Sequence, residues 1–176
     1  MYSDKLKAGA PFPEFTIPLV DGGEATVGGS SDEGRWKLAV IYRGLHCPLC
    51  AQYLEKLQSI QAEFAAQDTD VIAISGDGFE KAKSQVEKGG LNIPIGYDLS
   101  VEQMKKLGLY ISDPRSPEET DQPFPEPGLF LVRPDGNVQI IDISNAPFSR
   151  PDLTMILRGI TFAREKNYPI RGMHNS

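Results

Sequence analysis

Two short apolar runs, separated by a segment with helical periodicity, constrain the fold of this chain more than any other feature. Residues 36–42 and 71–75 consist mainly of aliphatic and aromatic residues, which is typical of strands buried on both faces. Between them, residues 48–66 place apolar side chains at every third or fourth position, which predicts a helix. A strand, a helix and a second buried strand in this order predict a parallel βαβ unit.

The other segments extend this unit with further short elements. We expect helices over residues 79–88, 100–107 and 151–166, a short strand over 94–97, and a hairpin formed by 129–133 and 138–143. A Gly- and Pro-rich N-terminal extension, residues 1–34, is expected to form an arm or a small hairpin, and residues 167–176 a tail. This order of elements predicts an α/β protein with a thioredoxin-like fold, in which helices flank a central mixed sheet. We expect a single domain over residues 1–176.

Size and charge exclude several classes of protein. A chain of 176 residues buries roughly 70% of its unfolded surface, so it needs no disulfide for stability. The net charge of -6 and the lack of a basic stripe argue against a nucleic-acid partner. The sequence has no apolar run near the ~20 residues of a membrane span and no N-terminal signal region. We therefore expect no membrane association and a cytoplasmic protein, in which thiols stay reduced.

Cys47 and Cys50 are the only cysteines in the chain, and two residues separate them. In the cytoplasm such a pair is more often catalytic or metal-binding than structural. The first N–H groups of a helix lack partners and carry partial positive charge, so a sulfur placed there can have its pKa lowered from ~8.5 to ~3.5–7.5. Because Pro48 suits the first helical position, we predict that Cys47 is an exposed N-cap and that Cys50 is more covered.

That asymmetry suggests distinct roles for the two sulfurs. Cys47 is predicted to attack the substrate, and Cys50 to close the Cys47–Cys50 disulfide. The alternative is a pair of unreactive core cysteines. His46, as an imidazolium, and Arg43 are candidate cations that would favour the thiolate, although a surface histidine without a role and a plain ion pair are equally compatible with the sequence. No cofactor is expected.

Residues 111–127 predict a long loop with five prolines and an acidic bias. Loops of this length inside a compact domain are usually functional or mobile. We favour a solvated surface loop, but its prolines also suit a semi-rigid lid over Cys47. In that case Glu126 would approach the sulfur and raise its pKa. Pro127 cannot donate to a sheet and is expected to mark the start of a strand.

Three stretches resemble one known family. They are Gly9 to Phe15, Tyr42 to Cys50, and the strands Val71 to Asp77 and Phe130 to Gly136. Together they resemble the alkyl hydroperoxide reductase/thiol-specific antioxidant (AhpC/TSA) branch of the thioredoxin superfamily, the peroxiredoxin-like proteins. The resemblance implies an antioxidant thiol oxidoreductase with Cys47 as the attacking sulfur and Cys50 as the resolving sulfur.

The departures from the family pattern leave the oxidant open. Val40 and Gly44 stand where typical peroxiredoxins have a proline and a threonine, and Pro127 stands where they have an arginine. Ile41 stands where thioredoxins keep a buried acid. Pro127 resembles the cis-proline of thioredoxins, which points to a cis Glu126–Pro127 bond and a substrate-binding role for both residues, whereas most X-Pro bonds are trans. Peroxides and protein disulfides both remain candidate substrates.

The implied partners are this substrate and a thiol electron donor of the thioredoxin or glutathione type, and a homodimer is compatible with the family. Two other functions stay open. One is a metal-binding module, for which the sequence offers His46, Cys47, Cys50 and His174; a lone Cys-x-x-Cys is half of a usual zinc site. The other is a redox-inactive interaction module that binds through the acidic side chains of Asp113, Glu118, Glu119 and Asp121.

Overall fold

Five strands form a central sheet in the order β5-β4-β3-β8-β9 in a computed structural model that describes residues 4–174. The strands of this sheet are β3 (Trp36–Ile41), β4 (Thr69–Ile74), β5 (Ile95–Gly96), β8 (Gly128–Val132) and β9 (Val138–Ile143). Strands β1 (Phe15–Pro18) and β2 (Glu24–Val27) form one small antiparallel sheet, and β6 (Ile111–Ser112) and β7 (Phe124–Pro125) form another. The helices are α1 (Pro48–Ser59), α2 (Gln61–Ala66), α3 (Phe79–Gly89), α4 (Val101–Lys106) and α5 (Leu153–Glu165).

The central sheet is mixed, as predicted. Strand β3 runs parallel to β4, with Leu38 opposite Val71, and β4 runs parallel to β5. On its other side β3 is antiparallel to β8, where Ile41 pairs with Gly128, and β8 is antiparallel to β9. The predicted βαβ unit and closing hairpin are therefore confirmed.

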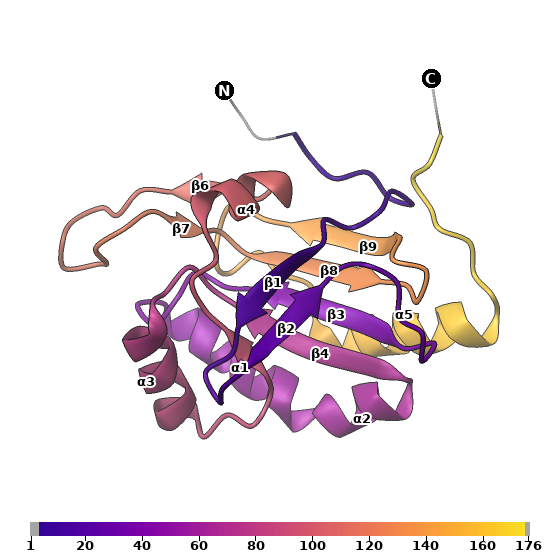
Figure 1. The fold of residues 1–176 in the computed structure, drawn as a ribbon, viewed down its shortest axis with the longest axis horizontal. Helices are drawn as coiled ribbons and strands as arrows, with labels where there is room; N and C mark the ends of the chain where they lie inside the picture. Colours follow the sequence, from indigo (N-terminus) through magenta and orange to yellow (C-terminus); the bar gives the residue numbers. More distant parts are fainter. Residues whose placement is uncertain (1–3, 175–176) are drawn as a thin grey trace.

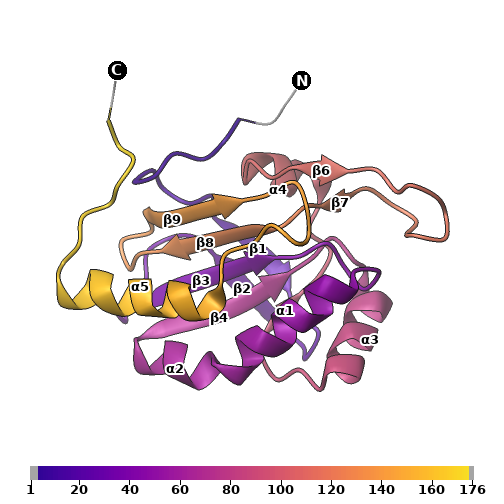
Figure 2. The same cartoon turned by 180° about the vertical axis from the view of Figure 1, so that it is seen from behind.

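A separate hydrophobic core packs against each face of the sheet. Because side chains alternate along a strand, Leu38, Val40 and Tyr42 point to the face packed against α1 and α5, whereas Ala39 and Ile41 point to the opposite core. Figure 2 shows α1, α2 and α5 on the first face, and Figure 1 shows the β1–β2 hairpin and α4 on the second. These buried residues fix where the ends of the central strands lie.

One predicted helix is two helices in the structure. The pattern over residues 48–66 predicted a single helix, but α1 ends at Ser59 and α2 begins at Gln61. Ile60 adopts φ -118° and ψ 13°, which is outside the helical region, and it is buried with Leu57 and Phe64 in one core. Tertiary packing thus overrides a periodicity that continues through the break.

The predicted loop over residues 111–127 is only partly irregular. Its two ends pair as β6 and β7, with Ile111 opposite Pro125. The residues between them, 113–123, form a projection that we call the excursion. Figure 1 shows it extending from the end of the molecule near α3. Most residues of the excursion are exposed, as the favoured interpretation of a solvated surface loop expects, but Thr120 is buried.

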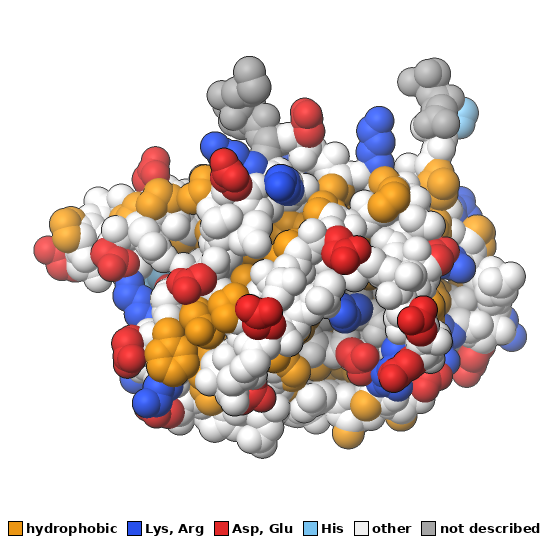
Figure 3. Space-filling view, in the orientation of Figure 1, with side chains coloured by type: hydrophobic (Ala, Val, Ile, Leu, Met, Phe, Trp, Pro, Cys, Tyr) orange, Lys and Arg blue, Asp and Glu red, His pale blue; other side chains and the backbone are white. Residues whose placement is uncertain are grey.

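The surface carries both signs of charge. On the face drawn in Figure 3, acidic and basic side chains are interspersed, and no stripe of one sign runs across it. None of the helices formed by residues 4–174 is both long enough and apolar enough to span a bilayer. The division into one domain with an extension and a tail stays a prediction.

Candidate active site

Cys47 is the N-cap of α1, as predicted. Its backbone is extended, with φ -112° and ψ 100°, and Pro48 follows as the first helical residue. The amide of Cys50 donates to the Cys47 Sγ at 3.2 Å. The same N–H also donates to the Cys47 carbonyl at 3.1 Å, so the sulfur shares one of the first N–H groups of the helix. In the reduced protein, a hydrogen bond of this kind would stabilise a thiolate on Cys47.

Cys47 and Cys50 form a disulfide in the structure. Their Cα atoms are 5.2 Å apart, a separation that suits a disulfide without movement of the backbone. Closing the bond therefore requires only that both side chains turn toward each other on the first turn of α1. The bonded pair is two electrons more oxidised than the two free thiols would be.

The predicted exposure of Cys47 is wrong. Only 2% of Cys47 is exposed, and Cys50 is fully buried. Both belong to the core that also contains Tyr42, Leu54 and Leu129. An N-cap on an isolated helix would face water, but α1 packs its first turn against the sheet. The oxidised pair is thus shielded from large partners.

Asp77 holds the turn before Cys47, a role that sequence reasoning missed. Its Oδ2 accepts the Leu45 N–H at 2.7 Å, and Gly44 O accepts the Cys47 N–H at 3.2 Å. Asp77 is 4% exposed, and burial raises the pKa of its carboxyl, against the lowering effects of the Leu45 amide and Lys81. Asp77 ends the stretch from Val71 that resembles the family, and the pairing of β3 with β4 brings it beside the turn.

Arg43 lies at the same end of the sheet and is mostly buried. Its Nε is 3.3 Å from Glu126 Oε2, its Nη2 is 3.9 Å from Glu119 Oε1, and its guanidinium stacks over the ring of Phe124 at 4.7 Å. Glu126 is also buried and accepts the Ser112 hydroxyl at 2.7 Å. Arg43, which follows β3, and Glu126, which follows β7, therefore form an ion pair at this end of the sheet.

Arg150 is a second cation near this unit that the sequence did not reveal. Its Nε donates to Pro147 O at 2.9 Å, and its guanidinium lies 4.3 Å from the ring of Tyr53. Its Nη1 is buried without a hydrogen-bond partner. Burial lowers the pKa of Arg150, and the charges of Arg43 and Glu126 act on it in opposite directions. A residue 100 positions beyond Cys50 carries no local signal of this proximity.

His46 does not provide the imidazolium that the sequence suggested. Burial is the main cause that lowers its pKa, and the positive charge of Arg43 lowers it further. The imidazole is thus neutral at neutral pH. Both ring nitrogens are buried without hydrogen-bond partners, and the ring packs edge-on against Phe124 at 4.6 Å.

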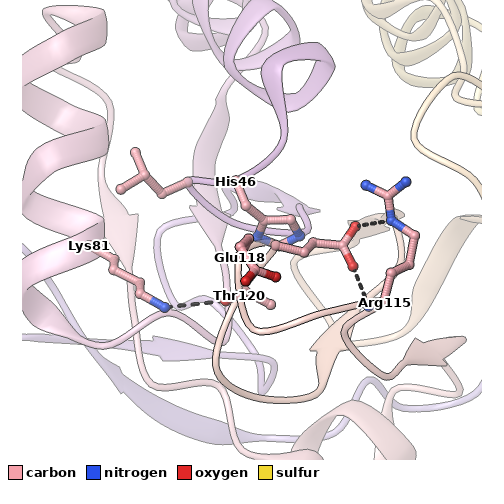
Figure 4. A pocket seen from close by; sticks show the side chains of 7 residues that line it. His46, Lys81, Arg115, Glu118 and Thr120 are labelled. Atoms are coloured by element: carbon pink, nitrogen blue, oxygen red, sulfur yellow. Dashed lines mark hydrogen bonds and ion pairs between the residues drawn. The ribbon is translucent and has the colours of Figure 1, made fainter.

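His46 lines a hollow of about 440 Å³ between α3, the excursion and residues 43–47, which we call the active-site turn. Figure 4 shows the side chains of Lys81, Arg115, Glu118 and Thr120 around it. Lys81 donates to Thr120 at 3.2 Å and also pairs with Asp121. These contacts attach the excursion to α3, beside the turn that carries His46.

Pro127 does not resemble a thioredoxin cis-proline in its geometry. All peptide bonds within residues 4–174 are trans, so the alternative of a cis Glu126–Pro127 bond is wrong. Pro127 does precede β8, as expected, and its carbonyl accepts the Ser144 N–H at 3.0 Å. The metal-binding alternative gains no support, because residues 4–174 contain no cluster of three or more His, Cys, Asp or Glu side chains that could hold an ion.

A family model, described as the AhpC/TSA family, matches residues 8–141. The chain belongs to the AhpC/TSA family. This membership confirms the resemblance seen in the sequence and makes the protein a peroxiredoxin-like thiol oxidoreductase. Membership of this family implies a peroxide as substrate and a thiol as reductant.

Individual relatives agree with this assignment. A protein of Synechocystis sp. that is named as a peroxiredoxin is 28% identical over 156 residues, which are 84% of this chain and 74% of the relative. A peroxiredoxin-like protein from Aquifex aeolicus has a TM-score of 0.75 at 21% identity, covering 90% of this chain and 88% of that one. A 2-Cys peroxiredoxin of Plasmodium vivax has a TM-score of 0.74 at 16% identity, covering 93% and 85%. The structural likenesses confirm the predicted thioredoxin-like fold.

Proposed function

We propose that this AhpC/TSA protein reduces peroxides, with Cys47 as nucleophile and Cys50 as resolving cysteine. The observation that carries the proposal is the position of Cys47, an N-cap whose sulfur accepts the Cys50 amide and is almost wholly buried. A small oxidant can reach such a sulfur through local opening, whereas a protein disulfide needs a broadly exposed one. The burial therefore favours a peroxide over a protein substrate.

The chemistry has two steps. The Cys47 thiolate attacks one peroxide oxygen, the O–O bond breaks, and the departing oxygen takes a proton and leaves as an alcohol or water. The sulfenic acid on Cys47 is then attacked by the Cys50 thiolate, which forms the Cys47–Cys50 disulfide and releases water. A thiol donor of the thioredoxin or glutathione type reaches the disulfide when the first turn of α1 opens, returns two electrons and is itself oxidised to a disulfide.

The surrounding side chains have roles that this chemistry needs. Arg43 is the proposed stabiliser of negative charge on the departing oxygen, and Glu126 keeps its guanidinium in place through the 3.3 Å pair. Neutral His46, with unpartnered ring nitrogens, is the proposed hydrogen-bond donor to the oxidant. Pro127 is proposed to shape the oxidant site beside Glu126. We place the reaction in the cytoplasm, and a homodimer remains compatible with it.

Reduction of protein disulfides is the second candidate, and one surface feature favours it. Leu49, between the two cysteines, is 41% exposed and lines a hollow of about 360 Å³ together with Tyr53 and Phe148. A hollow beside a dithiol that exposes apolar side chains is the kind of surface on which a polypeptide segment can dock.

The two candidates are separated by one pair of assays on the reduced protein and its single-cysteine variants. Stopped-flow mixing with hydrogen peroxide should oxidise wild type rapidly, leave Cys47→Ser unreacted and trap a sulfenic acid in Cys50→Ser. Insulin-disulfide reduction should be slow in all three proteins. Rapid insulin reduction without a reaction with peroxide would select the second candidate, and equal activity in Cys47→Ser would refute both.

A further inference from the structure

We propose that Asp77 is the positioning residue of the active-site turn, residues 43–47, and that its carboxylate sets the orientation in which Cys47 meets its substrate. The inference rests on the proposed role of Cys47 as nucleophile. Asp77 follows β4. The site residues predicted from the sequence lie instead on the first turn of α1, on the residues just before it, and on the segment before β8.

The first observation is a pair of linked hydrogen bonds. Asp77 Oδ2 accepts the Leu45 N–H at 2.7 Å. One residue earlier, the carbonyl of Gly44 accepts the Cys47 N–H at 3.2 Å. The carboxylate and the N-cap are thus joined through two successive residues of the same turn. A displacement of Leu45 moves the peptide plane whose oxygen holds Cys47.

The second observation is the shape of the space above Gly44. Gly44 is buried and adopts φ +139°, which disfavours any residue with a side chain. A Cβ at this position would lie 2.7 Å from Asp77 Oδ1 and 2.9 Å from Oδ2. The carboxylate therefore occupies the volume that a side chain at position 44 would need. A side chain at position 44 would therefore collide with the Asp77 carboxylate.

The third observation is that the backbone of Asp77, which carries this carboxylate, is itself held in place. The Asp77 N–H donates to Ser75 Oγ at 3.2 Å, and its carbonyl accepts the Asp98 N–H at 2.8 Å. The charged groups that act on its carboxyl are Lys81 from α3 and Asp121 from the excursion, whose effects oppose each other. A buried carboxylate costs free energy unless its hydrogen bonds are satisfied. Here its partner is the turn that carries Cys47.

The test compares three variants of the reduced protein by the rate at which Cys47 reacts with iodoacetamide and with hydrogen peroxide. Asp77→Ala removes the acceptor and should slow both reactions by about tenfold to a hundredfold, the effect of misplacing a reacting group. Asp77→Asn keeps an oxygen that can accept the Leu45 N–H and should stay within about threefold of wild type, a change too small to indicate a displaced group. Asp70→Ala is the matched control, because Asp70 lies on β4, the strand that precedes Asp77, but pairs with Arg35 on the surface.

Rates are compared only at equal folded fractions, measured by circular dichroism and urea unfolding. If Asp77→Ala does not fold, Gly44→Ala replaces it, because its Cβ displaces the turn from the other side and should slow the same reactions. The proposal is wrong if Asp77→Ala, or its replacement, reacts within twofold of wild type, or if Asp77→Asn loses as much rate as Asp77→Ala.

The two readouts separate this proposal from the proposed function. If wild type fails to react with peroxide, the oxidant assignment fails, but alkylation of Cys47 still measures its positioning. If peroxide oxidises wild type and both Asp77 variants equally fast, the proposed function stands and the role of Asp77 is refuted.

Discussion

The active-site turn and the excursion lie side by side, yet the structure holds them by opposite means. The turn is fixed by buried hydrogen bonds, from Leu45 to Asp77 and from Cys47 to Gly44. The excursion is attached through side chains: Lys81 pairs with Asp121 at the surface, Gln122 donates to the Gly76 carbonyl, and Glu119 lies 3.9 Å from Arg43. Buried bonds resist salt and solvent, whereas exposed ion pairs contribute little and are screened. The protein thus keeps its nucleophile rigid beside a segment that it can move at low cost.

The largest effect on the free energy of unfolding is expected in the core against which the first turn of α1 packs. Leu54 on α1 is fully buried in the same cluster as both cysteines. Leu54→Ala should lower the free energy of unfolding by about 2–5 kcal/mol, because it leaves a cavity. Glu118→Ala, on the exposed part of the excursion, is the control and should change it by less than about 0.5 kcal/mol. Urea unfolding measures both, and equal effects would contradict the contrast between the regions.

Arg43 joins the two regions, and its removal should affect the reaction more than the fold. Arg43→Met should lower the second-order rate constant with peroxide by on the order of a hundredfold, as expected for loss of a group that stabilises developing charge. Arg115→Met, which removes a side chain that is 86% exposed, should leave that constant nearly unchanged. Stopped-flow fluorescence can measure both variants. A normal rate in Arg43→Met would exclude the arginine from the oxidant site.

The carboxyl of Asp77 should leave a signature in the pH dependence of stability. Its pKa in the folded protein is raised above 3.8 by burial, so the folded state binds this proton more tightly than the unfolded state. The contribution of this carboxyl to the unfolding free energy should therefore fall as pH rises from 3.8 through the raised pKa. Asp77→Asn removes this fall, and its stability relative to wild type should increase over that range. A difference that stays constant with pH in urea titrations would contradict the assigned environment.

The smallest effect is expected at the attachment of the excursion. Lys81→Met removes the ion pair with Asp121 and should lower the unfolding free energy by less than about 1 kcal/mol, an effect that shrinks as salt is added. Limited proteolysis within residues 113–123 should become faster at low salt and approach the wild-type rate at high salt. A large, salt-independent loss would show that the excursion is held as firmly as the turn.

Local patterns in the sequence were enough to predict the frame of the site. The buried run over residues 36–42, the helical spacing after Pro48 and the two cysteines predicted β3, α1 and the N-cap. The break at Ile60 was missed, because packing of that residue into the core, rather than local periodicity, ends the helix there.

Features that depend on residues far apart in the chain could not be predicted. The burial of Cys47 comes from the packing of α1 on the sheet, and the neutral state of His46 comes from burial beside Phe124. Asp77 and Arg150 reach the site through strand pairing and through the segment before α5. None of these contacts leaves a periodic or compositional signal, so the sequence predicted the attacking sulfur but not its surroundings.

The pKa of the Cys47 thiol in reduced Cys50→Ser protein tests the account most directly. The Cys50 amide that bonds the sulfur belongs to the backbone, so the substitution preserves it. The pH dependence of alkylation should give a pKa below the ~8.5 of a free cysteine and within ~3.5–7.5. A value at or above ~8.5 would show that the helix start does not stabilise the thiolate, and would contradict the assignment of Cys47 as the nucleophile.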